Sequence, residues 1–239
     1  MKNVTVVLWR HAPTPANAAG TLQGQSDTPI GEAGLELGRA AAARLIQMYG
    51  TPAAVFSSPL ERARATAQLL GRDVSVVQGM NQRSYGIWEG MSIEDVAAQF
   101  PHELAVRDAG GDPDIPGWET SAQVGERVAA SIVACSDLIL DEIAAGKLFF
   151  DEVSGLGRPL TSVAAASENP GATGASEAAE KPPVLVFASH GSAIATGLRR
   201  LLGLPEEPQI FGYLHHANWV ELQRVDGVWK VERYDYGVS

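Results

Sequence analysis

Short apolar segments rich in β-branched residues alternate along this chain with longer segments of helical periodicity. Four apolar segments predict strands: Val4–Arg10, Ala54–Ser57, Val74–Val77 and Val184–Ala188. Helical patterns occupy the stretches between and after them, at residues 31–49, 60–70, 92–99, 120–145 and 192–202. Such alternation is typical of a mostly parallel sheet with helices on both faces. We therefore predict an α/β fold, a three-layer α/β/α sandwich.

The C-terminal part of the chain carries a different pattern. Trp219–Arg224 and Val228–Tyr234 read as two strands around Asp226–Gly227, a dipeptide that favours a tight hairpin. This pair predicts an antiparallel edge on the otherwise parallel sheet.

The chain of 239 residues predicts a single domain over residues 1–239. Residues 151–183 interrupt it with a segment dominated by Ala, Ser, Gly, Pro and Glu. A segment of this composition buries too little apolar surface to offset the entropy lost on ordering. We expect it to be a flexible insertion.

Charge and composition exclude several classes of protein. Eighteen Lys and Arg against 28 Asp and Glu give a net charge of -10, so a nucleic-acid partner is not expected. The single cysteine, Cys135, excludes an internal disulfide framework, and no apolar stretch has the length of a membrane span. The expectation is a soluble, cytoplasmic protein without a membrane partner, in which a few local cations would hold any anionic ligand.

Histidines and arginines follow three of the predicted strands. Arg10 and His11 end the first strand, Arg62 lies just after the second, and His190 and Gly191 follow the fourth. The carboxyl ends of parallel strands share one edge of a sheet, where ligands bind. Neutral imidazole is a competent nucleophile, and the arginine fork matches phosphoryl oxygens. The pattern favours an anion site suited to phosphoryl transfer.

Five motifs carry a resemblance to a known family. They are Leu8–Trp9–Arg10–His11–Ala12–Pro13–Thr14 with Asn17, then Gln23–Gly24, Ser57–Ser58–Pro59–Leu60–Glu61–Arg62–Ala63, Tyr85–Gly86–Ile87–Trp88–Glu89–Gly90 and Ser189–His190–Gly191. In this order they resemble the histidine phosphatase superfamily, which includes the cofactor-dependent phosphoglycerate mutases. The resemblance implies a phosphoglycerate mutase-like fold.

The same resemblance implies roles for individual residues. His11 would attack phosphorus and become phosphohistidine, while Arg10, Arg62 and His190 would bind the phosphoryl oxygens. The other residues expected to contact substrate are Asn17, Gln23, Gly24, Gln82, Tyr85 and Gly191. The implied activity is metal-independent phosphomonoester hydrolysis of a small phosphorylated metabolite, with no cofactor. Oligomeric state is left open.

The chain departs from the family pattern at two positions. Ala12 replaces a glycine, which is tolerable where the backbone avoids positive φ. Gln82 stands where the family places a glutamate that protonates the leaving oxygen, and an amide cannot supply that proton. Three explanations stay open: another acid, a leaving group that needs little protonation, or a protein that binds phosphoesters with little or no turnover. The nearest acids are Glu89, Asp112, Asp114 and Glu119.

Two other functions compete with phosphomonoester hydrolysis for this sequence. Phosphoglycerate mutase-type transfer is the alternative, but the arginine pair and proline-rich segment of the mutases have no equivalent here. Between Phe100 and Thr120 the only arginine is Arg107. An esterase using Ser189 would leave the arginines without a role and is rejected. The pair His215–His216 does not indicate a metal site, since neighbouring residues of a strand face opposite sides.

Overall fold

A computed structural model describes residues 3–150, 157–159, 181–205 and 210–238. Its main sheet has six strands in the order β3-β2-β6-β1-β7-β8. These are β1 (Val4–Arg10), β2 (Ala54–Ser57), β3 (Val74–Val76), β6 (Val184–Ser189), β7 (Trp219–Val225) and β8 (Val228–Tyr236). Strands β3, β2, β6 and β1 are parallel, and β7 and β8 add antiparallel edge strands. The predicted mixed sheet is confirmed.

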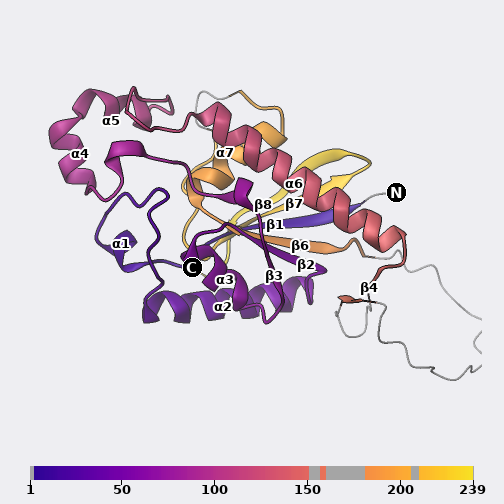
Figure 1. The fold of residues 1–239 in the computed structure, drawn as a ribbon. Coiled ribbons are helices and arrows are strands. Elements are labelled where there is room, and N and C mark those ends of the chain that lie inside the picture. Colours follow the sequence, from indigo (N-terminus) through magenta and orange to yellow (C-terminus); the bar gives the residue numbers. More distant parts are fainter. Residues whose placement is uncertain (1–2, 151–156, 160–180, 206–209, 239) are drawn as a thin grey trace, which may run out of the picture.

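Helices cover both faces of this sheet (Figure 1). Helices α2 (Glu32–Tyr49) and α3 (Glu61–Gln68) pack on one face, and α6 (Ser121–Ala144) and α7 (Gly191–Leu201) on the other. The α6 helix begins as predicted, because Thr120 and Gln123 form a reciprocal capping box. The three-layer sandwich follows from the alternation of strands and helices along the chain.

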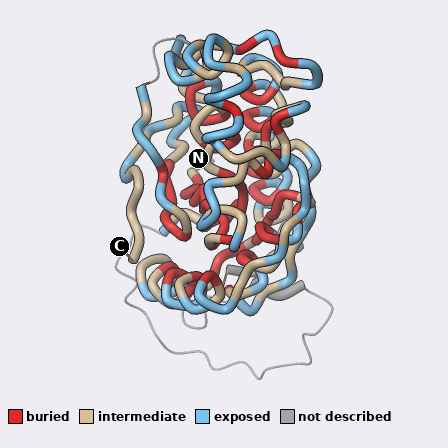
Figure 2. Tube along the Cα trace, turned by 90° about the vertical axis from the view of Figure 1, so that its left-hand side faces the viewer, coloured by how far each residue is buried: buried red, intermediate tan, exposed pale blue. Residues whose placement is uncertain are grey.

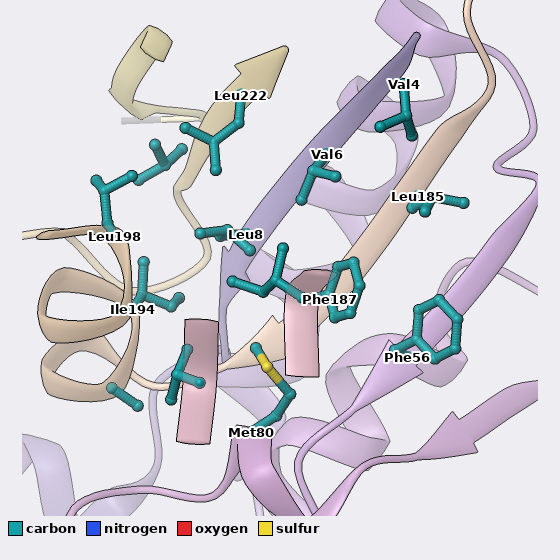
Figure 3. Packing of buried hydrophobic residues seen from close by; sticks show 14 of the residues in the cluster. Val4, Val6, Leu8, Phe56, Met80, Leu185, Phe187, Ile194, Leu198 and Leu222 are labelled. Atoms are coloured by element: carbon teal, nitrogen blue, oxygen red, sulfur yellow. The ribbon is translucent and has the colours of Figure 1, made fainter. Parts of the chain in front are cut away.

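Alternating side chains of β1 belong to two separate hydrophobic clusters. Val6 and Leu8 pack with residues of α6 and α7, whereas Val7 and Trp9 pack with α2 and α3. Figure 3 shows the first cluster at close range, with side chains of β1, β6 and α7 meeting above the sheet. Burial on both faces explains why β1 is an uninterrupted apolar run. Figure 2 shows buried segments gathered in the interior and exposed segments on the outside of the molecule.

A smaller third cluster lies beside the carboxyl edge of the sheet. It joins Trp88, Val96 and Ile115, from η2 (Gly86–Trp88), from α4 (Ile93–Gln99) and from the loop before α6. The helix predicted over 92–99 ends before Phe100–Pro101, and Pro101 then begins a further helix that the sequence pattern does not predict, α5 (Pro101–Asp108). Proline is well suited to the first turn of a helix, where its missing N–H would have no partner.

The remaining elements are short. Helix α1 (Pro15–Ala18) follows β1, η1 (Gln78–Met80) follows β3, and β4 (Leu148–Phe150) pairs with β5 (Gly157–Pro159) in a two-stranded sheet. The sequence pattern did not predict β5. Residues 151–156 and 160–180 of the expected insertion lie outside the described residues. No helix among the described ranges has both the length and the apolar character needed to cross a membrane.

Candidate active site

Backbone hydrogen bonds bring the ends of three parallel strands together. The His11 N–H donates to Ser189 O at 2.9 Å, and the Ser58 N–H donates to Ala188 O at 2.9 Å. The segments after β1, β2 and β6 are therefore fixed side by side. This juxtaposition is what the sequence predicted for the carboxyl edge of the sheet.

His11 is buried and held in one tautomer. Its Nδ1 lies 2.8 Å from Ala12 O, and because a carbonyl only accepts, Nδ1 carries the proton and Nε2 a lone pair. Burial, followed by the positive charges of Arg62 and Arg10, holds the pKa of His11 well below its ordinary value. The side chain is thus a neutral imidazole with a free lone pair, the form that a nucleophile requires.

Arg10 is oriented by the loop that precedes β7. Its Nη1 donates to Leu214 O, its Nη2 lies 2.7 Å from His216 Nε2, and its guanidinium lies 4.8 Å from the centroid of the Tyr213 ring. None of these partners is a carboxylate, so the charge of Arg10 is oriented without being neutralised.

Arg62 is buried close enough to His11 to affect its pKa. Its Nη1 donates to Ser26 O at 2.8 Å and its Nη2 to Gly24 O at 2.7 Å. Burial lowers the pKa of Arg62 to about 10, which leaves the group charged at neutral pH. The backbone carbonyls of Ser26 and Gly24 thus orient Arg62, just as Leu214 and His216 orient Arg10.

His190 completes the group. Its ring centroid lies 5.1 Å from that of His11, and its Nε2 lies 2.8 Å from Ser58 Oγ. Burial, and then the neighbouring His11 and Arg62, lower the pKa of His190 well below its ordinary value. The structure therefore brings together His11, Arg10, Arg62 and His190, the four residues expected to be catalytic.

Three nitrogen atoms of this group are buried without a hydrogen-bond partner in the described residues: Arg10 Nε, Arg62 Nε and His190 Nδ1. Leaving a buried polar group unpaired costs about 1–3 kcal/mol. The two arginine N–H groups are donors, and together with the His190 ring they offer polar contacts suited to an anion with several oxygens.

Ala12 is accommodated at its glycine-like position. Its φ lies outside the left-handed region, and its N–H donates to Thr66 Oγ1 at 3.0 Å. Thr66 Oγ1 donates in turn to Arg62 O at 2.7 Å, which ties the segment after β1 to α3. This departure from the family motif leaves the geometry intact.

A cavity of about 610 Å³ opens beside this group. Four predicted substrate contacts line it: Asn17, Gln82, Tyr85 and Gly191. Four arginines also line it: Arg10, Arg83, Arg107 and Arg199. The aromatic residues of the lining, besides Tyr85, include Trp118, Phe211 and Tyr213. The cavity wall is thus cationic in a chain of net charge -10.

Gln23 and Gly24 lie behind this wall. Gln23 Oε1 accepts hydrogen bonds from the hydroxyls of Thr14 and Thr28, and Gly24 presents its carbonyl to Arg62. Gly24 has φ +52°, and a Cβ there would lie 2.3 Å from Glu89 Oε1, so only glycine fits. In the described structure these two residues shape the loop that holds Arg62.

His216 is a site residue that the sequence reasoning missed. It lines the cavity, its ring lies 5.3 Å from that of His11, and burial followed by Arg10 lowers its pKa to about 3. The backbone reverses at Ala217, a non-glycine residue with φ +63°, whose N–H donates to His11 O. Strained backbone of this kind concentrates at functional sites. As part of a strand, the pair His215–His216 suggests only metal binding, whereas in the structure the pair lies in the loop before β7.

Comparisons with known proteins agree with this geometry. The family model of the histidine phosphatase superfamily (branch 1) matches residues 6–138. A glucosyl-3-phosphoglycerate phosphatase from Mycolicibacterium vanbaalenii is 31% identical over 232 residues, which cover 93% of this chain and 86% of the relative. A metal-independent phosphoserine phosphatase from Arabidopsis thaliana is 34% identical over 129 residues, covering 51% of this chain and 54% of the relative.

A solved structure extends the comparison to the whole chain. That of a mycobacterial glucosyl-3-phosphoglycerate phosphatase has a TM-score of 0.71 and 25% identity, covering 98% of this chain and 100% of the other. Fold and relatives together define a metal-independent phosphatase. More particularly, the chain belongs to the histidine phosphatase superfamily.

Proposed function

We propose that this protein hydrolyses a small phosphorylated metabolite through a phosphohistidine formed on His11. The observation that carries the proposal is a buried neutral histidine, His11, grouped with His190 and with two arginines whose Nε–H donors have no partner among the described residues. These donors would bind phosphoryl oxygens and stabilise the charge that develops as phosphorus is transferred.

The reaction would proceed in two steps. The Nε2 lone pair of His11 forms a bond to phosphorus as the bond to the leaving oxygen breaks. Water then attacks phosphorus, the electrons of the N–P bond return to Nε2, and the released phosphate and solvent take up the proton of the attacking water. Asn17, whose Oδ1 accepts from the Thr14 N–H, keeps its Nδ2 as a donor at the cavity wall.

The wall of the cavity favours hydrolysis over mutase-type transfer. Arg83 forms an ion pair with Asp112 at 2.9 Å and Arg107 with Asp108 at 2.6 Å. Because carboxylates already neutralise these two arginines, they are poorly placed to clasp a carboxylate of the substrate as the mutases do.

The absence of an acid at Gln82 favours a second candidate, a family member that binds phosphoesters with little turnover. Phosphate release from para-nitrophenyl phosphate, together with vanadate affinity, separates the two. We expect turnover by the wild type and none by His11→Ala, while His102→Ala, at a side chain that is 85% exposed, keeps the wild-type rate. Tight vanadate binding without turnover would establish the binding protein instead, and absence of both would overturn the proposal.

A further inference from the structure

The position of the missing acid points to a class of substrate. Gln82 stands where the superfamily resemblance places the glutamate that protonates the leaving oxygen. We propose that this phosphatase acts on phosphate compounds whose leaving group departs as a stable anion, such as an acyl, enol or aryl phosphate or a phosphoanhydride. The inference rests on the proposed function and specifies the substrate class of the same site.

Gln82 is fixed in place as a neutral group. Its Oε1 accepts from the Arg83 N–H at 3.0 Å, and its main-chain oxygen accepts from Arg127 Nη2 and Gln25 Nε2, each at 3.1 Å. Its Nε2 is the end of the side chain left to donate at the cavity wall. An amide N–H stabilises a departing oxyanion by hydrogen bonding but gives up no proton near neutral pH.

Glu89 does not take over the role of the acid. Its carboxylate accepts hydrogen bonds from four donors: Gln25 N and Tyr85 N at 3.1 Å, Ser26 Oγ at 3.2 Å and Ser84 Oγ at 3.4 Å. These contacts engage both oxygens of the carboxyl group. Glu89 therefore organises the loops around it as an acceptor.

Asp112 and Glu119 are held as carboxylates too. Asp112 accepts from Arg83 Nη1 at 2.9 Å and Trp118 Nε1 at 3.0 Å, and Glu119 receives a two-pronged contact from Arg127 at 2.6 and 2.8 Å. Burial alone would raise the pKa of both carboxyls, but these hydrogen bonds outweigh it and lower both pKa values. Neither group carries a proton to donate at neutral pH.

Two further titratable groups of the cavity lining, Asp108 and His216, are engaged as acceptors. Asp108 accepts from both Nε and Nη2 of Arg107, at 2.9 and 2.6 Å, and His216 Nε2 accepts from Arg10. Asp114 is exposed and lies outside the cavity lining of the described residues. In the part of the chain that the structure describes, every acid considered for the role is thus engaged as an acceptor or lies away from the cavity.

The charge of the cavity suits an anionic leaving group. Of the four arginines in its described lining, Arg83 and Arg107 pair with Asp112 and Asp108, whereas Arg10 and Arg199 have no carboxylate partner among the described residues. As the N–P bond to His11 forms, the P–O bond breaks and its electron pair leaves with the oxygen. The product departs as a carboxylate, enolate, phenolate or phosphate and takes any proton from water afterwards. Fixed cations beside the departing oxygen favour this charge separation.

The test is the dependence of kcat/KM on the leaving group. A series of substituted phenyl phosphates and methyl phosphate would be compared for the wild type, Gln82→Glu and Gln123→Glu. The last is a matched control, because it makes the same exchange in the capping box of α6, outside the cavity. General acid catalysis contributes about 10²–10⁴-fold. We expect Gln82→Glu to raise the ratio of kcat/KM for methyl phosphate to kcat/KM for para-nitrophenyl phosphate by that factor, and Gln123→Glu to match the wild type.

The wild type alone already decides the inference, even if Gln82→Glu fails to fold. A steep fall in kcat/KM as the pKa of the leaving phenol rises supports it, and a shallow slope would show that an acid is at work and overturn it. If acetyl phosphate and the nitrophenyl ester give neither phosphate release nor phosphohistidine, the proposed function itself fails. That result is separate from a shallow slope, which requires turnover.

Discussion

Arg10 Nη2 lies 2.7 Å from Nε2 of His216, a residue 206 positions further along the chain. Since a guanidinium only donates, His216 must be the acceptor and must be neutral. Together with Leu214 O, it fixes the outer edge of Arg10 and leaves Nε of Arg10 unpartnered beside His11. His216 is thereby a positioning residue for a phosphate ligand.

Replacing His216 with alanine should weaken phosphate binding. Hydrogen bonds to charged groups contribute about 1.5–3 kcal/mol, so we expect KM and the inhibition constant of vanadate to rise about 10-fold or more. His216→Asn offers a carbonyl oxygen to Arg10 and should recover most of the affinity. Equal affinities of the alanine variant and the wild type would refute the positioning role.

Stability should fall in mild acid because of the same histidine. The pKa of His216 is about 3 in the folded protein, against an ordinary 6.5, so the unfolded chain binds more protons as pH falls below 6.5. After allowance for partial exposure, we expect this residue to lower the free energy of unfolding by about 1 kcal/mol between pH 7 and pH 5. Urea unfolding at pH 7 and pH 5 measures this effect, and the free energy of unfolding should fall less for His216→Asn than for the wild type. An identical loss would contradict the assignment.

Gly191 lets Arg10 approach the start of α7. A Cβ at this position would lie 3.2 Å from both Cζ and Nε of Arg10, so Gly191→Ala should displace the guanidinium. Small misplacements of catalytic groups can lower rates about 100-fold, and we expect kcat/KM to fall by about 10–100-fold with no loss of thermal stability. In Gly31→Ala the new Cβ meets only Pro15, at 3.4 Å, and this control should keep its activity. An active Gly191→Ala enzyme would count against the role of Arg10.

Thr66 links the nucleophile segment to α3. Thr66→Val leaves the buried N–H of Ala12 without its acceptor, which should lower the free energy of unfolding by about 1–3 kcal/mol. Thr66→Ser keeps the hydroxyl and should lose clearly less. Urea denaturation of the three proteins measures the difference, and a valine variant as stable as the wild type would be inconsistent with this account.

Much of this fold follows from local patterns. The buried runs of β1 and β6 and the hairpin at Asp226–Gly227, with φ of +50° and +85°, could be predicted because each is encoded in adjacent residues. Helix α5 could not, since a proline ends one helix as readily as it begins the next. The pairing of β4 with β5 could not be predicted, because β5 is Gly-Arg-Pro and glycine and proline are depleted in strands.

The site was predictable where motifs lie at strand ends. His11, Arg62 and His190 meet because the parallel sheet brings those ends together. His216 was missed because its position depends on the left-handed turn at Ala217, a conformation that alanine does not signal. Gln23 belongs to one of the family motifs but does not line the cavity. Its side-chain oxygen accepts hydrogen bonds from the hydroxyls of Thr14 and Thr28. The roles expected for these residues in substrate contact stay predictions.

The central claim is that His11 carries the phosphoryl group. Rapid acid-free quenching of the enzyme with a labelled aryl phosphate, followed by peptide mass spectrometry, tests it directly. We predict an acid-labile, alkali-stable phosphoramidate on the peptide containing His11, absent from His11→Ala. Phosphate on another residue, or turnover by His11→Ala at the wild-type rate, would contradict it.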